Sequence, residues 1–385
     1  MKEEIHLLDL PIEKTYIKLN DNFRERFFEL SYNKYNSWNK LGKSLGVKRA
    51  DTIIARNWRY GDCCTPLSVI LKISKEINIS INEIENNIAE IKFKTSLNKR
   101  GGSSGKPIIN PNLPIIINED FMEIIGHICG DGSITRSSPH KGVSLRYVNS
   151  EPILIESFKE KVRRVFGNIE PNIQIRNGGN YTRDNYCLQY PTILSMFILS
   201  VFDCQSNELK DAPEFIFDLP IRAKCSFLRA LFDDEGTVSV KDKAITIGLK
   251  PIKIVEKIRS LLIELGFNPS KIFMSGGVNK IILCRKEDII LFNEIIGFKH
   301  PSKNEKLISI IKNGWKFNRY INGEVKEKIV EIIKDKKTAN LKDFAIILNR
   351  HPETIRRHLN NMQKEKFIIS KRENNEFLWS LNEQT

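Results

Sequence analysis

The sequence contains an internal duplication, and this feature constrains the fold more than any other. Pro152 and Pro251 each begin an apolar-periodic helix, and each is followed by a glycine, Gly167 or Gly266. The offset is 99 residues at both places, from 152 to 251 and from 167 to 266. Alternating strands are predicted before and after each helix, at Ser133–Thr135, Val143–Val148, Ile169–Ile175 and Tyr186–Tyr190, and at Thr237–Lys241, Ala244–Leu249, Lys271–Met274 and Lys280–Cys284. Each copy therefore predicts the order helix-strand-strand-helix-strand-strand-helix.

The helix that opens each copy ends in an acidic residue followed by glycine. The first reads Ile-Ile-Gly-His-Ile-Cys-Gly-Asp-Gly over 124–132, and the second reads Leu-Arg-Ala-Leu-Phe-Asp-Asp-Glu-Gly over 228–236. Asp131 and Glu235 occupy matching positions. The simplest alternative is that Gly132 and Gly236 are ordinary helix caps beside exposed acids. Two such motifs in register favour a functional role.

Small residues lie at helical spacing inside these motifs. Gly126 and Gly130 are four residues apart, on one helix face, and Ala230 matches Gly126. Small side chains at this spacing allow two helix backbones to approach closely. We expect the two helices to cross and to bring the carboxylates of Asp131 and Glu235 together.

Carboxylates at the negative ends of two helices are electrostatically unfavourable, by about 0.3–1 kcal/mol each. A divalent cation removes this repulsion, because Mg²⁺ and Ca²⁺ prefer oxygen ligands. A bound cation can also activate water and stabilise the leaving oxygen of a phosphodiester. The pattern therefore predicts a metal-dependent phosphodiesterase.

Residues 120–315 resemble the LAGLIDADG homing endonucleases in the single-chain form that carries two motifs. The resemblance implies a tandem αββαββα core, saddle-shaped sheets over the DNA major groove, and double-strand cleavage that leaves 3′ extensions. It implies Mg²⁺ as cofactor, with Mn²⁺ as a substitute and Ca²⁺ supporting binding without cleavage. The catalytic candidates are Asp131, Glu235, Lys250 and Lys303, and the metal candidates are Asp131, Glu235, Gly130 and Asp234.

Three residues depart from the motif pattern of the family. His127 stands at a usually apolar position, Cys129 replaces the first acid of the motif, and Asp234 replaces a small residue near the helix crossing. A buried charge costs stability unless it is paired. Asp234 is therefore expected either to be paired or to line the metal site.

Strand alternation predicts which side chains face DNA. With Val143, Leu145 and Tyr147 inward, Ser144 and Arg146 face outward; with Ile173 and Ile175 in the core, Gln174 and Arg176 are exposed. Such polar and basic side chains read base edges and hold phosphates. The predicted DNA-binding residues are Arg49, Arg56, Arg136, Ser144, Arg146, Gln174, Arg176, Arg183, Ser239, Lys241, Thr246, Arg356 and Arg357.

The flanks of the duplication predict further DNA-binding domains. Residues 1–95 are interpreted as a helical domain with a helix-turn-helix around Gly46, or as a plain helical bundle, and 96–118 as a basic Gly/Ser/Pro linker. The repeats occupy 119–204 and 205–315. Residues 320–385 predict two helices and a hairpin, the order of a winged helix-turn-helix. The fold class is α+β.

The charge balance fits a nucleic-acid partner. Lysine and arginine number 61 against 47 acids, a formal net charge of +14, which favours double-stranded DNA. Intron RNA is a second possible partner. No membrane span or secretion signal is recognised, and we expect a cytoplasmic monomer. The start at Met1 and the lack of a terminal His-Asn favour a free-standing enzyme. The alternatives are a non-catalytic DNA-binding transcription regulator and an intron RNA maturase.

Overall fold

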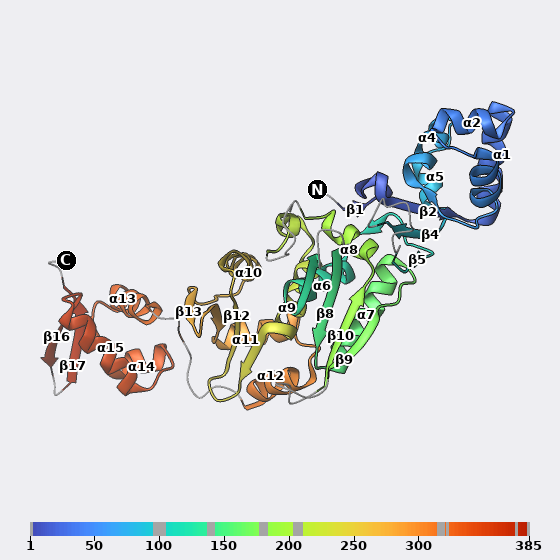
Figure 1. Ribbon diagram of the computed structural model, residues 1–385. Helices are drawn as coiled ribbons and strands as arrows, with labels where there is room; N and C mark the ends of the chain where they lie inside the picture. The colour runs from blue at the N-terminus through green and yellow to red at the C-terminus, as the bar shows by residue number, and fades with distance from the viewer. Residues whose placement is uncertain are drawn as a thin grey trace. The chain divides into compact units, whose positions relative to one another are not determined.

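The computed structural model describes residues 3–94, 105–136, 143–176, 184–202, 211–313, 320, 323–373 and 376–382. The described chain is a mixed α+β protein (Figure 1). It divides into two compact units, Met1–Asp234 and Glu235–Thr385, which are described separately.

The N-terminal domain contains a sheet as well as helices, so the purely helical prediction for residues 1–95 was wrong. The sheet has the order β3-β2-β4-β5. Its strands β2 and β4 are short and far apart in the sequence, so local periodicity could not reveal their pairing. The domain's elements are β1 (Glu4–Ile5), β2 (Thr15–Leu19), α1 (Asp21–Tyr35), α2 (Trp38–Leu45), α3 (Ala50–Thr52), the π-helical η3 (Ile53–Trp58), β3 (Thr65–Pro66), α4 (Leu67–Ile77), α5 (Ile81–Glu85) and β4 (Ile88–Phe93), with the short 3-10 turns η1 (Leu7–Asp9) and η2 (Ile12–Lys14).

Helices α2 and α3 are held close together by small residues. A Cβ added at Gly42 would lie 2.3 Å from the Cβ of Ala50. Gly46 ends α2 with a φ of 70°, in the left-handed region that glycine adopts without strain. The break predicted at Gly46 is therefore present, and a short turn connects the two helices.

The segment predicted as a linker takes part in two sheets. Residues 95–104, which include most of its basic Gly/Ser half, lie outside the described residues. Beyond them, β5 (Ile108–Ile109) pairs with β4, and β6 (Ile115–Ile116) pairs with β1. Ile109 also forms a bridge with Asn168 in the first repeat. A pattern rich in proline concealed these two-residue strands.

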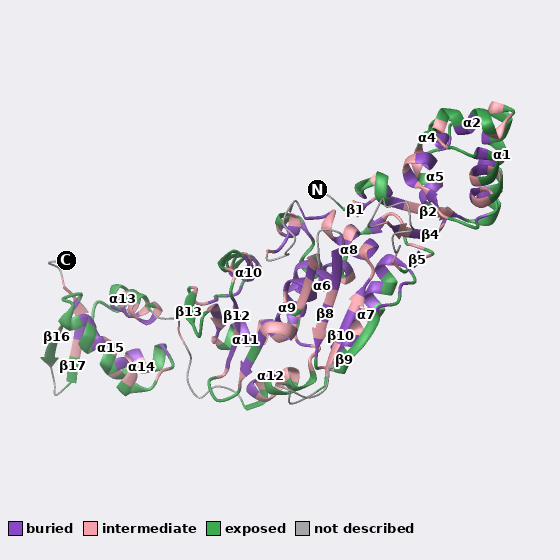
Figure 2. Ribbon diagram, viewed as in Figure 1, coloured by how far each residue is buried: buried purple, intermediate pink, exposed green. Residues whose placement is uncertain are grey.

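The first repeat has the predicted order of elements. Its sheet runs β7-β8-β10-β9, and buried residues dominate α6 and β8 (Figure 2). The elements are α6 (Glu119–Cys129), β7 (Gly132–Arg136), β8 (Val143–Asn149), α7 (Pro152–Phe166), β9 (Asn172–Arg176), β10 (Asn185–Tyr190) and α8 (Thr192–Leu199). The 3-10 turn η4 (Glu214–Asp218) and α9 (Ile221–Glu235) follow.

Helices α6 and α9 pack with their backbones in near contact, as the small residues predicted. A Cβ added at Gly126 would lie 2.4 Å from the carbonyl oxygen of Phe227 and 2.7 Å from the Cβ of Ala230. At Gly130 the nearest atom would be the Cβ of Asp234, at 2.8 Å. Both glycines are therefore required by the helix crossing.

The second repeat has the same sheet topology as the first. Its order is β11-β12-β14-β13, the counterpart of β7-β8-β10-β9, which confirms that the duplication in sequence is a duplication in structure. The elements are β11 (Gly236–Ser239), β12 (Ala244–Leu249), α10 (Ile252–Glu264), β13 (Phe273–Ser275), β14 (Val278–Leu283), α11 (Lys286–Leu291), the π-helical η5 (Phe292–Ile296) and α12 (Pro301–Asn313).

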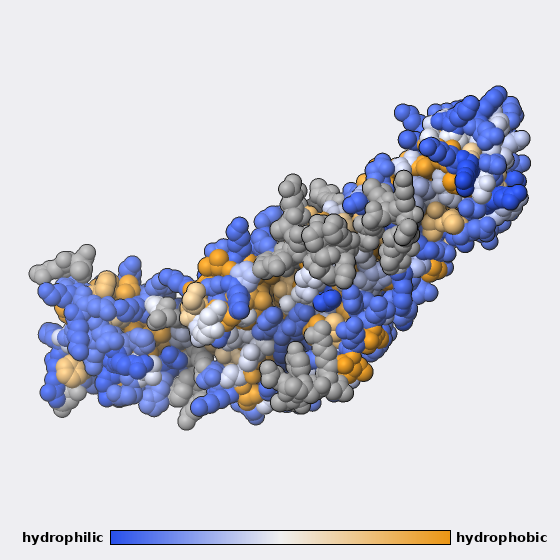
Figure 3. All heavy atoms as spheres, viewed as in Figure 1, coloured by the Kyte–Doolittle hydropathy of each residue, from blue (hydrophilic) through white to orange (hydrophobic). Residues whose placement is uncertain are grey.

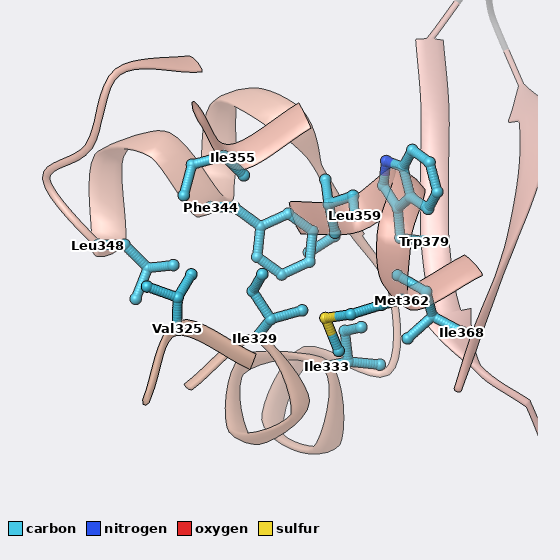
Figure 4. Close-up of a cluster of buried hydrophobic side chains, with 11 residues drawn as sticks. Val325, Ile329, Ile333, Phe344, Leu348, Ile355, Leu359, Met362, Ile368 and Trp379 are labelled. Carbon is cyan, nitrogen blue, oxygen red and sulfur yellow. The ribbon is translucent and has the colours of Figure 1, made fainter. Parts of the chain in front are cut away.

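The C-terminal segment forms three helices and a three-stranded sheet of order β15-β17-β16. Its apolar core gathers side chains from every one of these helices (Figure 4). The predicted apolar face of its last helix, Ile355, Leu359 and Met362, is buried in that core. The elements are α13 (Glu324–Lys336), β15 (Ala339–Asn340), α14 (Leu341–Ile347), α15 (Pro352–Lys364), β16 (Ile368–Glu373) and β17 (Glu376–Leu381).

Hydrophilic side chains cover most of the visible surface of the N-terminal helices and of the C-terminal segment (Figure 3). Within the described residues, no helix combines the length and the apolar character that crossing a membrane requires.

Substitution of Gly126 by alanine tests the close helix crossing. The added methyl group overlaps the Phe227 carbonyl, and overpacking of this kind costs about 1–3 kcal/mol. We expect urea unfolding to show a loss of stability in this range. The double variant Gly126→Ala/Ala230→Gly removes one of the two clashes and should recover part of the loss. Equal stability of Gly126→Ala and wild type would contradict the close approach.

Candidate functional site

Asp131 is exposed, and its carboxylate accepts a hydrogen bond from a side chain of the neighbouring strand. Asp131 follows α6 and directly precedes β7. Gly132 pairs with Tyr147 in the antiparallel register of β7 and β8, so the end of β8 returns to Asp131. There, Asn149 Nδ2 donates a hydrogen bond to Asp131 Oδ2 at 2.9 Å.

The orientation of the Asn149 amide is fixed by the backbone. Its Oδ1 accepts a hydrogen bond from the Glu151 backbone N–H at 2.8 Å, which leaves Nδ2 directed at carboxylates. Nδ2 also lies 3.3 Å from Asp234 Oδ1. Because Asn149 is buried, this amide is a rigid donor that connects Asp131 to Asp234.

Asp234 lies at the helix crossing and is paired there, which is one of the two positions expected for it. Its side chain has 0% exposure. Tyr147 Oη donates to Asp234 Oδ1 at 3.0 Å, and the Asp131 backbone N–H lies 3.4 Å from Oδ2. These two donors partly offset the cost of burying the charged carboxylate at the helix crossing.

His127 supplies the positive charge that pairs with Asp234. Its Nδ1 lies 3.0 Å from Asp234 Oδ2, and both side chains are fully buried. Burial opposes charging of the imidazole, but the adjacent Asp234 carboxylate outweighs it and raises the pKa of His127. Two of the three departures from the family motif, His127 and Asp234, are therefore partners, and the charge of one compensates the charge of the other.

A chain of ionised side chains continues from His127 toward the surface. His127 Nε2 lies 3.9 Å from Glu123 Oε1, and Glu123 Oε2 lies 3.3 Å from Lys161 Nζ. Lys161 also pairs with Asp120, which in turn contacts Arg164 at 2.8 Å. Each buried charge thus has a neighbour of opposite sign, as buried charges require.

In the second repeat, Glu235 directly precedes β11 and Lys250 directly follows β12, so both lie at the same end of this strand pair. Glu235 is the last residue of α9 and precedes Gly236, which pairs with Ile247 in β12. Because the strands are antiparallel, the exposed Lys250 lies at that end of β12. Lys303 lies in the first turn of α12, a helix that contacts β11.

The strand register assigns one polar face to the first sheet. Arg146 pairs with Ser133 and Gln189, and Gln189 pairs with Asn172. By strand alternation Gln174 shares this face. The predicted DNA-facing residues Arg146 and Gln174 therefore do lie on one side of the sheet.

Three predictions about this sheet need correction. Ser144 lies on the polar face but is only 8% exposed, because Gln189 Nε2 donates to its hydroxyl at 3.0 Å. Ile173 and Ile175 were expected in the core but are 50% and 56% exposed. They belong to β9, the edge strand, where one neighbouring strand is missing.

The remaining predicted DNA contacts are dispersed. Ser239 hydrogen-bonds Asp242 at 2.8 Å in the turn after β11, Lys241 lies in that turn and not in a strand, and Thr246 is half-buried in β12. Four predicted contacts are exposed: Arg49, which directly precedes α3, Arg56 in η3, and Arg356 and Arg357 in α15. The side chains of Arg136 and Arg176, and the whole of Arg183, lie outside the described residues.

Arg356 lines a hollow between α15 and the β16–β17 hairpin. The hollow has a volume of about 600 Å³. Its other polar lining residues are Asn340, Lys342, Asn360, Gln363, Ser370 and Glu376. Arg357 does not line it.

The oxygen donors near Asp131 fit a hard divalent cation. Asp131 offers an exposed carboxylate and Gly130 a backbone carbonyl, the donor types that Mg²⁺ prefers. Among the described ranges, no group of three or more His, Cys, Asp or Glu side chains is placed to hold a metal ion. A site completed by DNA phosphate oxygens does not require such a group.

Sequence reasoning missed Asn149 and the hydroxyl of Tyr147. The signal that could have found them is the strand register, since Asn149 lies two residues beyond the partner of Gly132. The corresponding position in the second repeat is Leu249, two residues beyond Ile247. An apolar side chain therefore stands in the second repeat at the position of Asn149.

Residues 222–297 match the family model described as a LAGLIDADG-like domain. The chain contains a LAGLIDADG-like domain. The matched segment includes the second motif, with Glu235, and the whole of the second sheet.

The chain is similar to segments of curated proteins with unrelated names. It is 27% identical over 322 residues to glutamine–fructose-6-phosphate aminotransferase of Methanocaldococcus jannaschii, covering 80% of this chain and 27% of that protein. It is 27% identical over 227 residues to a protein named probable translation initiation factor IF-2 of Thermococcus kodakarensis, covering 56% of this chain and 18% of that protein. The chain thus spans about a quarter or less of the length of these relatives.

Solved structures of homing endonucleases also resemble the chain. I-DmoI in complex with DNA and Mn has a TM-score of 0.36 at 19% identity, covering 47% of this chain and 97% of that one. I-WcaI bound to its DNA recognition sequence has a TM-score of 0.38 at 17% identity, covering 50% of this chain and 87% of that one. The N-terminal LAGLIDADG domain of DUF199/WhiA has a TM-score of 0.36 at 17% identity, covering 48% of this chain and 85% of that one.

The pairing of His127 with Asp234 can be measured with a double-mutant cycle. His127→Leu leaves the Asp234 charge buried without its cation, which costs about 3–5 kcal/mol. The double variant His127→Leu/Asp234→Ala removes both charges and places in α6 the leucine that α9 has at Leu231. We expect it to be more stable than His127→Leu in urea unfolding, with a coupling energy of about 0.5–3 kcal/mol. Additive losses would show that the two side chains are independent.

The same pair predicts a pH dependence of stability. The folded protein raises the pKa of His127 above its unfolded value of about 6.5. The stabilisation is therefore fully present below about pH 6.5 and is lost as the pH rises through the folded pKa. The stability difference between wild type and His127→Leu/Asp234→Ala should shrink as the pH rises above about 6.5. A difference that grows with pH would contradict a charged His127.

Proposed function

We propose that this protein is a site-specific, metal-dependent DNA endonuclease. The observation that carries the proposal is the match of residues 222–297 to a LAGLIDADG-like domain, which includes the acidic motif ending at Glu235. The first repeat supplies the matching motif at Asp131, on a sheet of identical strand order. The expected product is a double-strand cut with 3′ extensions.

In the proposed reaction, Asp131 and Glu235 would each supply a carboxylate to a divalent metal ion, and Lys250 would offer positive charge to the scissile phosphate. A bound Mg²⁺ or Mn²⁺ supplies an activated water and stabilises the leaving oxygen. Asn149 keeps the Asp131 carboxylate in one orientation through its 2.9 Å hydrogen bond. The polar sheet face with Arg146 and Gln174 holds the DNA.

The flanking domains extend the proposed DNA contact. The exposed Arg49 directly precedes α3 and the exposed Arg56 lies in η3, and α15 with its hairpin has the element order of a winged helix. Linked modules raise affinity by making later contacts intramolecular. Because both acidic motifs lie in one chain, we propose that the enzyme acts as a monomer.

The similarity to curated relatives favours an activity of this chain that is separate from the activities by which those relatives are named. The relatives are named as an aminotransferase and as a translation factor, and each shares less than a third of its length with the chain. A segment common to proteins of such different activities does not account for either activity. We therefore propose neither of those functions here.

Substitution of the two acids tests the proposal. DNA duplexes that bind the protein in Ca²⁺ are first selected from a randomised library and then incubated with Mg²⁺. We expect cleavage by wild type, and a loss of about 100-fold or more for Asp131→Asn and for Glu235→Gln, because each removes metal binding at the transition state. Asp335→Asn, an exposed acid on α13, is the matched control and should cleave normally.

Binding and cleavage are measured separately, so the outcomes distinguish the candidate functions. Retained binding in Ca²⁺ by both acid variants assigns the acids to chemistry. Tight binding by wild type without any cut in Mg²⁺ or Mn²⁺ would replace the endonuclease with a DNA-binding regulator. Preference for a structured intron RNA over every duplex would favour the maturase.

A further inference from the structure

The N-terminal sheet has a concave, lysine-lined face that none of the predicted DNA contacts uses. The hollow has a volume of about 360 Å³ and lies over β2 and β4, with the loop from Gly61 to Cys64 as its wall. The lining side chains are Tyr16, Lys18, Asp62, Cys63, Cys64, Glu90, Lys92 and Lys94.

The lysines of the hollow share one side of the sheet because of the strand register. Tyr16 pairs with Lys92, and Lys18 pairs with Glu90. The intervening residues of β2 and β4, such as Ile17 and Ile91, are buried on the opposite side. Lys92 and Lys94 are two residues apart, so they project from the same face about 6.6 Å apart along the chain.

The positive charges in the hollow exceed the acids available to them. Glu90 serves two lysines at once, at 3.9 Å from Lys18 Nζ and 3.2 Å from Lys92 Nζ. Lys94 Nζ lies 5.1 Å above the ring of Tyr16. Burial opposes the charge of Lys92, but interactions with Cys64 and Glu90 raise its pKa, so it remains an ammonium at neutral pH.

These ammonium groups are already held in place. The side chains of Lys18 and Lys92 are only 30% and 28% exposed, whereas freely solvated lysines extend into water. Groups that are ordered before binding lose less conformational entropy when a ligand arrives. The hollow is therefore better suited to a polyanion than an ordinary basic surface is.

We propose that this hollow binds the phosphodiester backbone of DNA. Three lysines against Glu90 and Asp62 leave a net positive charge, and lysine ammonium groups bind phosphate as point charges. The chain as a whole carries a formal charge of +14. The loop that forms the wall begins three residues after η3, the helical segment with Arg56, so the hollow adds phosphate contacts to that part of the domain. The proposal requires DNA binding and does not require cleavage.

A pair of charge-matched variants tests the proposal in the full-length protein. Lys18→Gln/Lys94→Gln removes two ammonium groups and keeps the Lys92–Glu90 pair. Lys72→Gln/Lys75→Gln makes the same change on the exposed side of α4. Fluorescence anisotropy with a mixed-sequence DNA duplex gives the affinity at several KCl concentrations, and thermal unfolding confirms that each variant is folded.

Lys18→Gln/Lys94→Gln should lower the affinity for the duplex about tenfold or more. The slope of the logarithm of its association constant against the logarithm of the KCl concentration should become shallower by about 1.8, or about 0.9 for each lost phosphate contact. The α4 control should keep the wild-type slope. Glu90→Gln, which releases Lys18 and Lys92 from their shared acid, should bind more tightly. Equal losses in both double variants, or no gain for Glu90→Gln, would overturn the proposal.

A second measurement does not depend on substitution. Acetylation of wild-type lysines, read by mass spectrometry with and without the duplex, should show protection of Lys18 and Lys94 but not of Lys72. Absence of protection would overturn the proposal even if affinities change. Protection by single-stranded RNA and not by the duplex would overturn the assignment to DNA. Loss of cleavage in the acid variants leaves all of these results unchanged, so the two proposals fail independently.

Discussion

The close crossing of α6 and α9 is the constraint on which the rest of the first unit depends. Gly126 allows the Phe227 carbonyl to approach, and Gly130 makes room for the side chain of Asp234. Once Asp234 lies at the crossing, its charge must be compensated in the absence of water. His127, Tyr147 and Asn149 provide that compensation, and the same amide of Asn149 then orients Asp131. Helix packing and the proposed chemistry are thus coupled through one buried carboxylate.

The two repeats share a strand order but not this polar network. His127 matches Leu231 in the motif alignment. Gly132 pairs with Tyr147 in the first sheet, and Gly236 pairs with Ile247 in the second. The position that carries an aromatic hydroxyl in one copy therefore carries an aliphatic side chain in the other. A duplicated chain can keep its topology while the buried polar side chains of its two copies differ, because topology depends on the hydrophobic pattern whereas the network depends on a few individual side chains.

The sequence predicted the duplication, the order of the repeat strands and the close packing at Gly126, because each rests on a local period or on residue size. The apolar core around Ile355 and Leu359 was predicted for the same reason. The N-terminal sheet was missed because β2 and β4 are paired across a long interval of helices. The partner of Asp234 was missed because His127 is 107 residues away in the chain, and no periodicity indicates a contact of that range.

The pairing of β5 with β4 has a consequence for how such proteins are divided or recombined. Ile109 is bonded both to the N-terminal sheet and, through Asn168, to the first repeat. Gly167, with a φ of 102°, allows Asn110 and Pro111 to lie directly against it. Residues 105–118 therefore belong to both neighbours at once. An exchange of N-terminal domains between homologous chains must carry this segment and its receiving glycine together, since a junction placed inside it leaves two sheets with unmatched edges.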